Sequence, residues 1–391
     1  MRILVTDGDS RAALAAVRAL GARGHCLHVV ATAPGSLAGA SRFAASEHAA
    51  ADPSDDPKGW AEAIEQLARE LEVELLLPIT EVSLGTLFAF GIDRRLPVVC
   101  PPREAYELVV DKHALLERAA RLGLDCPRSV LIQDAAQLEE KARTFRFPAV
   151  LKPRRSCVLA EGRWAKAPVH ILRTPDELRA AWKIAQPFGD ALLQEFVPGH
   201  GEGIFLLARE GRTLVSFAHR RLREKPPTGG VSVLRESIAP DPELLNQGKR
   251  LLESLQWTGV AMLEFRRAPT GRAALMELNP RLWGSLQLAI DAGVDFPSLL
   301  VDLHRGAEIP PIEPQLGVRS RWLLGDLDHL LLSLRSRSMR QLTGQRPLPL
   351  LGGFLRSFVD GSRTEVLRWN DPRPFGRELR AWIRELRSGR G

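Results

Sequence analysis

Apolar residues in the first hundred positions alternate between short continuous runs and helical spacing. Three apolar runs predict strands, at residues 2–6, 27–30 and 74–78. Between them, apolar residues at helical spacing predict one helix that begins after Ser10 and another over 60–71. An alternation of strands and helices favours a parallel sheet with right-handed crossovers. We therefore expect residues 1–103 to form an α/β domain.

A second set of elements follows the proline pair at 101–102. Apolar spacing predicts a helix over 106–123 that ends at Gly123 and carries Lys112 near its start. The next predicted elements are strands at 127–132, 148–153, 192–199 and 203–208, and helices at 135–144 and 241–255. Lys152 directly follows an apolar strand, so we expect its ammonium group to emerge at a strand end.

Two basic segments in this region show no regular pattern. Residues 154–168 predict an irregular loop after the strand that ends near Lys152. Residues 219–230 follow the predicted hairpin 212–218 and are rich in Arg, Pro and Gly. We interpret 219–230 as a mobile cover over an anionic centre. A merely solvated loop is the alternative.

A β-hairpin is predicted where two apolar runs flank the turn residues 269–271. If Ala268 pairs with Ala273 across the turn, Glu264 lies directly opposite Glu277. Directly opposed residues in antiparallel strands hold their Cβ atoms roughly 4.5–5.5 Å apart, and like charges there repel each other. Two opposed carboxylates are therefore unfavourable unless another group offsets their repulsion.

Asn279 lies two residues beyond Glu277 and shares its face of the strand. Two carboxylates and an amide carbonyl suit a hard divalent cation, since Mg²⁺ commonly binds one or two carboxylates together with substrate phosphates. A solvated strand face is the ordinary alternative for either glutamate alone. The joint pattern, which ends in Asn279, Pro280 and Arg281, favours a metal site.

Length and composition limit the class of protein. A chain of 391 residues is long enough for about two or three domains. Apolar residues make up 45% and charged residues 26%, as is ordinary for a globular protein. No signal peptide is recognisable, and no stretch approaches the ~18 apolar residues of a membrane span, so we expect a cytoplasmic protein. The four cysteines lack the spacing of a metal site or disulfide framework, which indicates reduced thiols.

Positive charge is concentrated at the C-terminal end. Residues 319–391 hold 15 Arg against 7 acidic residues, whereas the rest of the chain is close to neutral. No aromatic RNA-binding motif or metal finger accompanies this charge, so we do not expect a nucleic-acid partner. An acidic ligand, a protein partner or a membrane surface stays open. Helices are predicted at 322–342 and 379–386.

Lysine is scarce, with 8 Lys against 46 Arg, so the position of each lysine is informative. Lys112 and Lys152 both lie near predicted element ends. As point charges on flexible stems, lysines suit phosphate oxygens. A purely solubilising role on the surface is the alternative for both.

Taken together, these segments resemble the ATP-grasp superfamily over roughly residues 1–305. The likeness rests on motifs in the family's order: Asp111 with Lys112, the strand ending in Lys152, residues 194–199, the set Glu264, Glu277 and Asn279, and Arg281. The resemblance implies an ATP-grasp fold of the α/β (α+β) class. It divides the chain into an N-terminal Rossmann-like domain (1–103), an ATP-grasp domain (104–308, with a subdomain at about 113–193) and a basic C-terminal extension (309–391).

The resemblance also implies ATP and Mg²⁺ as cofactors, with Mn²⁺ as an alternative metal. By the family's pattern, the nucleotide is bound by Lys112, Lys152, Glu195, Phe196, Val197 and Glu202, of which the Glu195 carbonyl and Val197 N–H read adenine and Glu202 holds the ribose. The metal is bound by Glu264, Glu277 and Asn279. The transferred phosphoryl group faces Arg281 and Lys152, and Arg220, Arg221 and Arg223 lie on the segment expected to cover it.

The implied activity is an ATP-dependent ligase that activates a carboxylate as an acyl phosphate and joins it to an amine. Its partners would be these small molecules, and a homodimer is the family-based expectation. One alternative is an enzyme that uses bicarbonate, like carbamoyl-phosphate synthase or a carboxylase. Another is a non-catalytic ATP-binding module that docks a partner through its basic C-terminus. The family's phosphate-binding loop is glycine-rich, whereas residues 154–162 contain one glycine, so arginines would have to replace backbone contacts.

Overall fold

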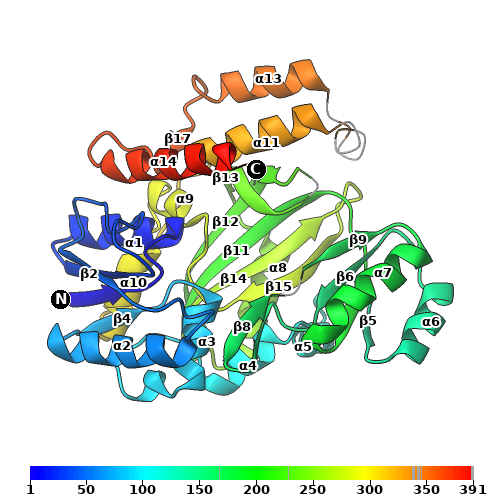
Figure 1. Ribbon diagram of the computed structural model, residues 1–391, viewed down its shortest axis with the longest axis horizontal. Coiled ribbons are helices and arrows are strands. Elements are labelled where there is room, and N and C mark those ends of the chain that lie inside the picture. Colours follow the sequence, from blue (N-terminus) through cyan, green and yellow to red (C-terminus); the bar gives the residue numbers. More distant parts are fainter. Residues whose placement is uncertain (167, 228, 337–339, 341–343, 345, 389–391) are drawn as a thin grey trace.

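The computed structural model describes residues 1–166, 168–227, 229–336, 340, 344 and 346–388. Four sheets organise the described part of the chain, and helices surround them (Figure 1). No helix in these residues is both long and apolar enough to cross a membrane.

The N-terminal sheet is parallel and has the strand order β3-β2-β1-β4. Its strands are β1 (Arg2–Val5), β2 (Cys26–Ala31), β3 (Ser46–Ala49) and β4 (Leu75–Leu77), and its helices are α1 (Arg11–Ala22), α2 (Pro57–Glu70), α3 (Glu81–Ala89) and the short η1 (Ile92–Arg94). The expected α/β alternation is confirmed. Strand β3 was not predicted, because its four residues are partly polar and only half-buried.

Two helices, α4 (Arg103–Val110) and α5 (Lys112–Arg121), replace the single helix predicted over 106–123, so that prediction was wrong. The break lies at Asp111, which has an extended backbone and caps α5. Its side chain accepts hydrogen bonds from the backbone N–H groups of His113 and Ala114 at 3.1 and 3.2 Å. The cap places Lys112 at the first position of α5.

A second, antiparallel sheet has the order β5-β10-β6-β9. It consists of β5 (Ser129–Ile132), β6 (Ala149–Pro153), β9 (His170–Leu172) and β10 (Ala191–Glu195), and it packs on α6 (Ala135–Thr144) and α7 (Pro175–Ala185), which the short η2 (Gln186–Phe188) follows. The predicted loop 154–168 instead contains a hairpin of β7 (Cys157–Ala160) and β8 (Arg163–Lys166). Positive φ angles at Glu161 (50°) and Gly162 (76°) form its tight turn.

The largest sheet has seven strands in the order β15-β14-β11-β12-β13-β16-β17. They are β11 (His200–Arg209), β12 (Arg212–Lys225), β13 (Val231–Ile238), β14 (Gly259–Arg267), β15 (Ala273–Asn279), β16 (Arg319–Arg321) and β17 (Arg363–Thr364). Alternate residues of β11 enter different cores. Phe205 and Leu207 pack with α1 and the N-terminal sheet, whereas Ile204 and Leu206 pack with α5 and α8 (Pro242–Ser254). The sheet is therefore buried on both faces, with α9 (Leu286–Asp291) and α10 (Phe296–His304) on the N-terminal side.

The C-terminal residues form α11 (Leu323–Arg335), α13 (Pro347–Arg356) and α14 (Arg373–Arg387). Helix α11 is shorter than the predicted 322–342, and part of that prediction lies outside the described residues. Helix α14 begins earlier than the predicted 379–386. Because β16 and β17 join the large sheet, these residues are part of its structure.

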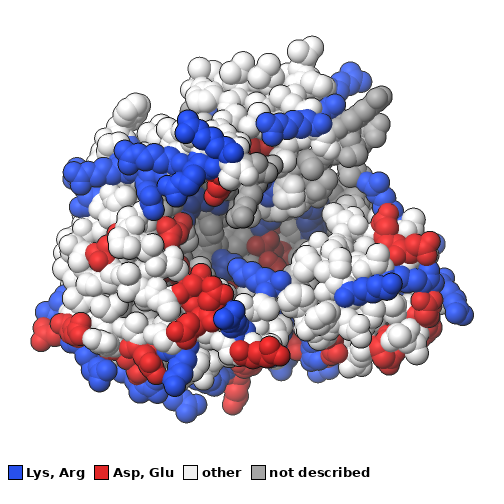
Figure 2. All heavy atoms as spheres, in the orientation of Figure 1, with Lys and Arg blue, Asp and Glu red and all other residues white. Residues whose placement is uncertain are grey.

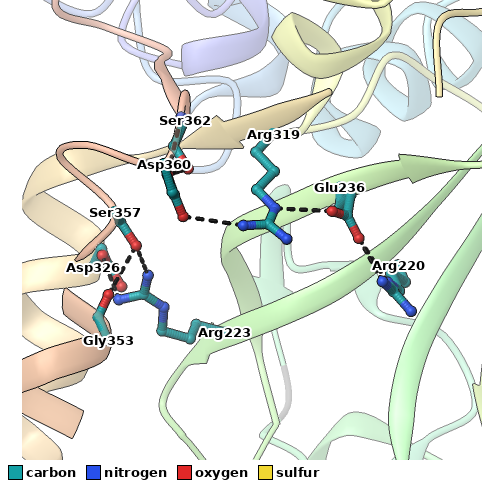
Figure 3. A network of polar contacts seen from close by, with 9 residues as sticks. All are labelled: Arg220, Arg223, Glu236, Arg319, Asp326, Gly353, Ser357, Asp360 and Ser362. Atoms are coloured by element: carbon teal, nitrogen blue, oxygen red, sulfur yellow. Dashed lines mark hydrogen bonds and ion pairs between the residues drawn. The ribbon is translucent and has the colours of Figure 1, made fainter. Parts of the chain in front are cut away.

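Buried ion pairs bind the C-terminal residues to the rest of the protein. The Arg18 guanidinium of α1 donates to Asp371 Oδ2 at 2.8 Å and to the carbonyl oxygens of Glu365, Val366 and Asp371. Figure 3 shows a second network across the sheet edge. It runs from Arg220 through Glu236 and Arg319 to Asp360, and a neighbouring contact joins Arg223 to Asp326 and Ser357.

Candidate functional site

The predicted pairing of Glu264 with Glu277 is present in the structure, but the hairpin reaches it by a different route. Ala273 pairs with Arg267 and not with Ala268, one residue off the expected register. A bulge then inserts one extra residue in β15 between Leu275 and Glu277, so the pairing returns to the predicted register. Without that bulge the two carboxylates would not be directly opposed.

The bulge also reorients a backbone group. Lys152 Nζ donates a hydrogen bond of 3.4 Å to the carbonyl oxygen of Met276, the extra residue. Lys152 lies on β6 of the second sheet and Met276 on β15 of the large one. The contact therefore aligns the lysine beside the glutamate pair.

Asn279 joins the two carboxylates. Its Nδ2 donates to Glu264 Oε1 at 3.1 Å and to Glu277 Oε1 at 3.3 Å. Its Oδ1 accepts from Arg281 Nη2 at 3.2 Å. Arg221 of β12 makes an ion pair with the other oxygen of Glu264. The cluster predicted from sequence is therefore compact, and two predicted arginines belong to it.

The donor set of this cluster fits a hard divalent cation. Both carboxylates lie within hydrogen-bonding distance of one –NH₂ group, so they converge on one point that now carries partial positive charge. A rotated Asn279 amide would present its oxygen to the same point. Within the described ranges no three His, Cys, Asp or Glu side chains form a metal cluster. A cation here would depend on two carboxylates, the amide and further oxygens, as is usual for Mg²⁺ with a bound phosphate.

The two glutamates have different electrostatic surroundings. Burial raises the pKa of Glu264, and the Arg221 guanidinium offsets this only in part. Burial acts in the same direction on Glu277, but the charges of Lys112 and Lys152 outweigh it and hold the pKa of Glu277 below its ordinary value. The pair therefore combines one firmly ionised carboxylate with one that protonates more easily.

Lys112 and Lys152 are both buried, which excludes the surface alternative for them. Lys112 Nζ donates to Ser156 Oγ at 2.5 Å, and its backbone N–H donates to Arg154 O. Burial, opposed by Glu277 and reinforced by Lys112, lowers the pKa of Lys152 to about 8. A buried ammonium with a lowered pKa favours a site that binds added negative charge.

These side chains line one cleft of about 1180 Å³. Figure 2 shows a hollow in this face, between the N-terminal sheet region on the left and the second sheet on the right. The predicted residues along the cleft are Lys112, Lys152, Glu195, Phe196, Val197, Arg221, Glu264, Glu277, Asn279 and Arg281. The volume exceeds the ~300–1,000 Å³ of ordinary small-molecule pockets, so a nucleotide and a second ligand would fit together.

Comparison with known proteins identifies the fold of the chain that forms this cleft. A family described as an ATP-grasp in the biosynthetic pathway with the Ter operon matches residues 187–325. N5-carboxyaminoimidazole ribonucleotide synthase from Synechococcus elongatus is 28% identical over 202 residues, 49% of this chain and 47% of that protein. This chain thus spans about half the length of that curated relative.

Solved structures give the same fold over more of the chain. N5-carboxyaminoimidazole synthetase from Staphylococcus aureus is 14% identical with a TM-score of 0.66, covering 86% of each chain. Biotin carboxylase from Campylobacter jejuni is 16% identical with a TM-score of 0.65, covering 81% of this chain and 74% of the other. The biotin carboxylase domain of Hydrogenobacter thermophilus 2-oxoglutarate carboxylase, solved with MgADP, ADP and bicarbonate, is 16% identical with a TM-score of 0.64, covering 81% and 73%.

The chain has the ATP-grasp fold, and its residues 187–325 match an ATP-grasp family. The family match includes the hairpin of Glu264 and Glu277 and ends inside α11. The later C-terminal elements lie outside it, yet one of them, α14, lines the cleft.

The segment predicted to read adenine lies along the cleft. Phe196 and Val197 line it directly after β10. The Glu195 side chain makes an ion pair with Arg272, which also donates to both carboxylate oxygens of Asp125. These contacts fix the segment against the β14–β15 turn.

Glu202, predicted to hold the ribose, is not among the residues that line the cleft. It is buried, and both of its oxygens accept from Arg267 Nε at 2.8 and 2.9 Å. His200 Nε2 lies 2.9 Å from the same carboxylate. The structure therefore places Glu202 on β11, where it pairs with Arg220 of β12 and Phe265 of β14, and does not bring it to the cleft.

The predicted loop over 219–230 was wrong for residues 219–225, which are part of a strand, while Gly229 and Gly230 after it line the cleft, so the covering role stays a prediction. Strand β12 continues to Lys225 and pairs with β13 through two register shifts. Of the three arginines on this segment, only Arg221 lines the cleft, while Arg220 and Arg223 make the ion pairs of Figure 3. The sequence was misleading because Pro and Gly are confined to the turn after Lys225.

Sequence reasoning missed one wall of the cleft. Arg377, Glu378, Ala381 and Glu385 of α14 line it together with Trp322 and Arg11. The Arg11 guanidinium lies 3.9 Å over the Trp322 ring, whose Nε1 donates to Glu378 at 2.7 Å. No local pattern could have indicated these contacts, since Trp322 is 56 positions from Glu378 and 311 positions from Arg11.

Glu81 also lines the cleft, at the first position of α3. Thr80, and not Glu81, is the residue that caps α3. Burial raises the pKa of Glu81, opposed by the charges of Arg281 and Lys112. Glu81 is thus a carboxylate of the site itself.

Proposed function

We propose that this protein is an ATP-dependent ligase that activates a carboxylate as an acyl phosphate and joins it to an amine. The observation that carries the proposal is the Glu264–Asn279–Glu277 cluster facing two buried lysines in one cleft. The names of the relatives support ligase chemistry. A protein that only bound a nucleotide would not need both the cluster of Glu264, Asn279 and Glu277 and the two buried lysines.

The nucleotide end of the cleft is defined by the second sheet. Lys112 and Lys152 would neutralise phosphate oxygens, since bound phosphate recovers the cost of their burial. Phe196 and Val197 would supply apolar walls for the base, beside the Glu195 backbone. Glu202 would reach a ribose only if its ion pair with Arg267 opened.

Glu264, Glu277 and Asn279 would hold Mg²⁺. When bound there, the ion would neutralise phosphate charge and orient the triphosphate. Arg221 offsets part of the burial that raises the pKa of Glu264, and Lys112 and Lys152 hold the pKa of Glu277 below its ordinary value. The protein thus holds both carboxylates ready for a cation although burial opposes their charge.

The reaction requires little from the protein besides position and charge. A substrate carboxylate oxygen attacks the γ-phosphorus, the bond to the β-phosphate oxygen breaks, and ADP leaves. An amine then attacks the acyl carbon and inorganic phosphate leaves. Arg281 would hold the carboxylate nucleophile near the phosphoryl group. Glu81 would accept the proton that the amine releases, because its raised pKa makes it a better base than an ordinary carboxylate.

Bicarbonate as the carboxylate is a second candidate. The names of several structural relatives favour it, since biotin carboxylases and carboxyaminoimidazole synthetases recur among them and one was solved with bicarbonate. The same cleft would serve, with bicarbonate attacking the γ-phosphorus beside Arg281. The acceptor amine would then become carboxylated.

A phosphate-release assay tests both candidates. MgATP would be offered with a panel of carboxylates and amines, with bicarbonate added or removed. Release that needs a carboxylate and an amine supports the ligase, and release that needs bicarbonate supports the second candidate. Glu277→Gln should abolish release, whereas Glu253→Gln on the exposed face of α8 should not. Nucleotide binding with no release under any combination would contradict both.

A further inference from the structure

Helix α13 has an unusual position for its composition. Seven of its ten residues are Leu, Pro or Phe, yet none is buried. In Figure 1 it lies above α11 at the outer edge of the molecule. The large apolar side chains exposed on it and just after it have 43% to 84% of their surface in solvent: Leu348, Leu351, Leu355, Phe358 and Val359. Contiguous apolar surface of this kind marks an interaction site.

The segment of α13 carries charge of one sign, and Asp360, which follows it, is paired with Arg319. From His329 to Val359 the sequence contains five Arg and no Asp or Glu. Arg346 and Arg356, at the two ends of α13, are both exposed. In Figure 2 the upper edge of the molecule is largely white, with blue side chains at its flanks. An apolar ridge between cations is complementary to an apolar surface that carries negative charge.

A second copy of this chain does not satisfy that requirement. A two-fold interface places the same patch of each subunit against itself. It would therefore bring together two copies of a segment that carries Arg346 and Arg356 at the ends of its helix and no acidic residue between them, and their charges would repel. The partner must be negative where this chain is positive.

We propose that α13 docks the protein on an anionic lipid surface. Leu348, Leu351, Leu355 and Val359 would enter the boundary between headgroups and acyl chains, and Arg346 and Arg356 would contact the headgroup phosphates. The ridge projects from the protein and is not a groove, which suits a flat and deformable surface. Because the helix is short, binding should be reversible and should weaken as salt screens the arginines.

Vesicle flotation tests this proposal with the full chain. The protein is mixed with vesicles of phosphatidylcholine alone or with part of it replaced by phosphatidylglycerol, at low and high salt. We expect flotation with the anionic vesicles at low salt only. Leu348→Glu with Val359→Glu should reduce the bound fraction about tenfold or more, since each exposed side chain loses its burial in lipid. Arg346→Glu with Arg356→Glu should reduce it likewise.

The matched control is Val169→Glu, another exposed apolar residue on a different part of the chain, which should bind vesicles normally. All these positions are exposed, so thermal unfolding should be unchanged in every variant. Absence of wild-type flotation on anionic vesicles would overturn the proposal, as would equal flotation of the α13 variants. A concentration-dependent dimer that Leu348→Glu dissociates would overturn it in favour of self-association.

Discussion

Replacing Lys152 with methionine should stabilise the free protein and weaken nucleotide binding at the same time. Lys152 is buried beneath the cleft, and its pKa of about 8 lies below its ordinary value of about 10.5. At ~1.4 kcal/mol per pH unit, keeping this ammonium charged in the empty site costs roughly 3 kcal/mol. Methionine has nearly the same shape and no charge, so Lys152→Met should raise the free energy of unfolding at pH 7 by up to about 3 kcal/mol.

The sign of the pH dependence follows from the direction of the shift. Below about pH 8 the lysine is protonated in both the folded and unfolded chain, so the full cost is present. Between about 8 and about 10.5 only the unfolded chain keeps the proton, and the cost disappears. The stability difference between Lys152→Met and the wild type should therefore shrink across this window.

Nucleotide binding should depend on pH in the opposite sense, because a higher pH removes the lysine charge that binds the triphosphate. If the triphosphate binds the protonated lysine, its Kd should rise up to about tenfold for each pH unit above about 8. Lys152→Arg should remove this dependence because a guanidinium stays charged. Titration calorimetry and urea denaturation measure the two effects, with Lys183→Met on the exposed side of α7 as a matched control. A pH-independent wild-type Kd, or a Lys152→Met protein less stable than the wild type, would refute the reasoning.

Three further predictions concern the cluster, the arginine beside it and the C-terminal contacts. Glu277→Gln should reduce the Mg²⁺-dependent gain in ATP affinity about tenfold or more, measured as Kd with and without the metal. Arg281→Lys should lower turnover about a hundredfold while leaving the Kd of ATP within a few fold, because it loses contacts made in the transition state. Arg18→Met should lower the free energy of unfolding by about 3–5 kcal/mol, since it leaves Asp371 buried and unpaired. Hydrogen bonds from Arg42, Ser41 and Arg18 outweigh the burial that raises the pKa of Asp371 and lower it, so this difference should vanish as the pH falls below about 3.8.

The glutamate pair was predictable because a strand has a strict two-residue period. One face of β14 and one face of β15 carry the acidic and amide residues, and the turn fixes the register to within one position. The bulge before Glu277 corrects that remaining error, and nothing in the sequence marks it. The sequence thus predicted the contact between Glu264 and Glu277 correctly, although the pairing it assumed near the turn was wrong by one residue.

The wrong predictions share a physical cause. The spacing predicts a continuous helix over 106–123 because apolar residues recur on both sides of Asp111, whereas Asp111 caps a new helix with one carboxylate oxygen and accepts from Arg154 with the other. The hairpin after β6 was missed because β7 and β8 are four residues each and mostly exposed. Short elements that depend on a distant partner leave too weak a periodic signal to be read locally.

The C-terminal wall of the cleft is the strongest case of such dependence. Arg11 begins α1, where it reads as an ordinary first-turn residue, yet its guanidinium pairs with Glu365 and stacks on Trp322. Burial lowers the pKa of Arg11 to about 10, opposed by the charge of Glu378, so this arginine is held charged in the cleft by the C-terminal elements. The end of the cleft that we propose for the nucleotide is built from residues within the ATP-grasp motifs, whereas another wall requires Arg11 of α1, Trp322 and α14 together. Substrate selection in this protein should therefore change with the C-terminal residues, while ATP binding should not.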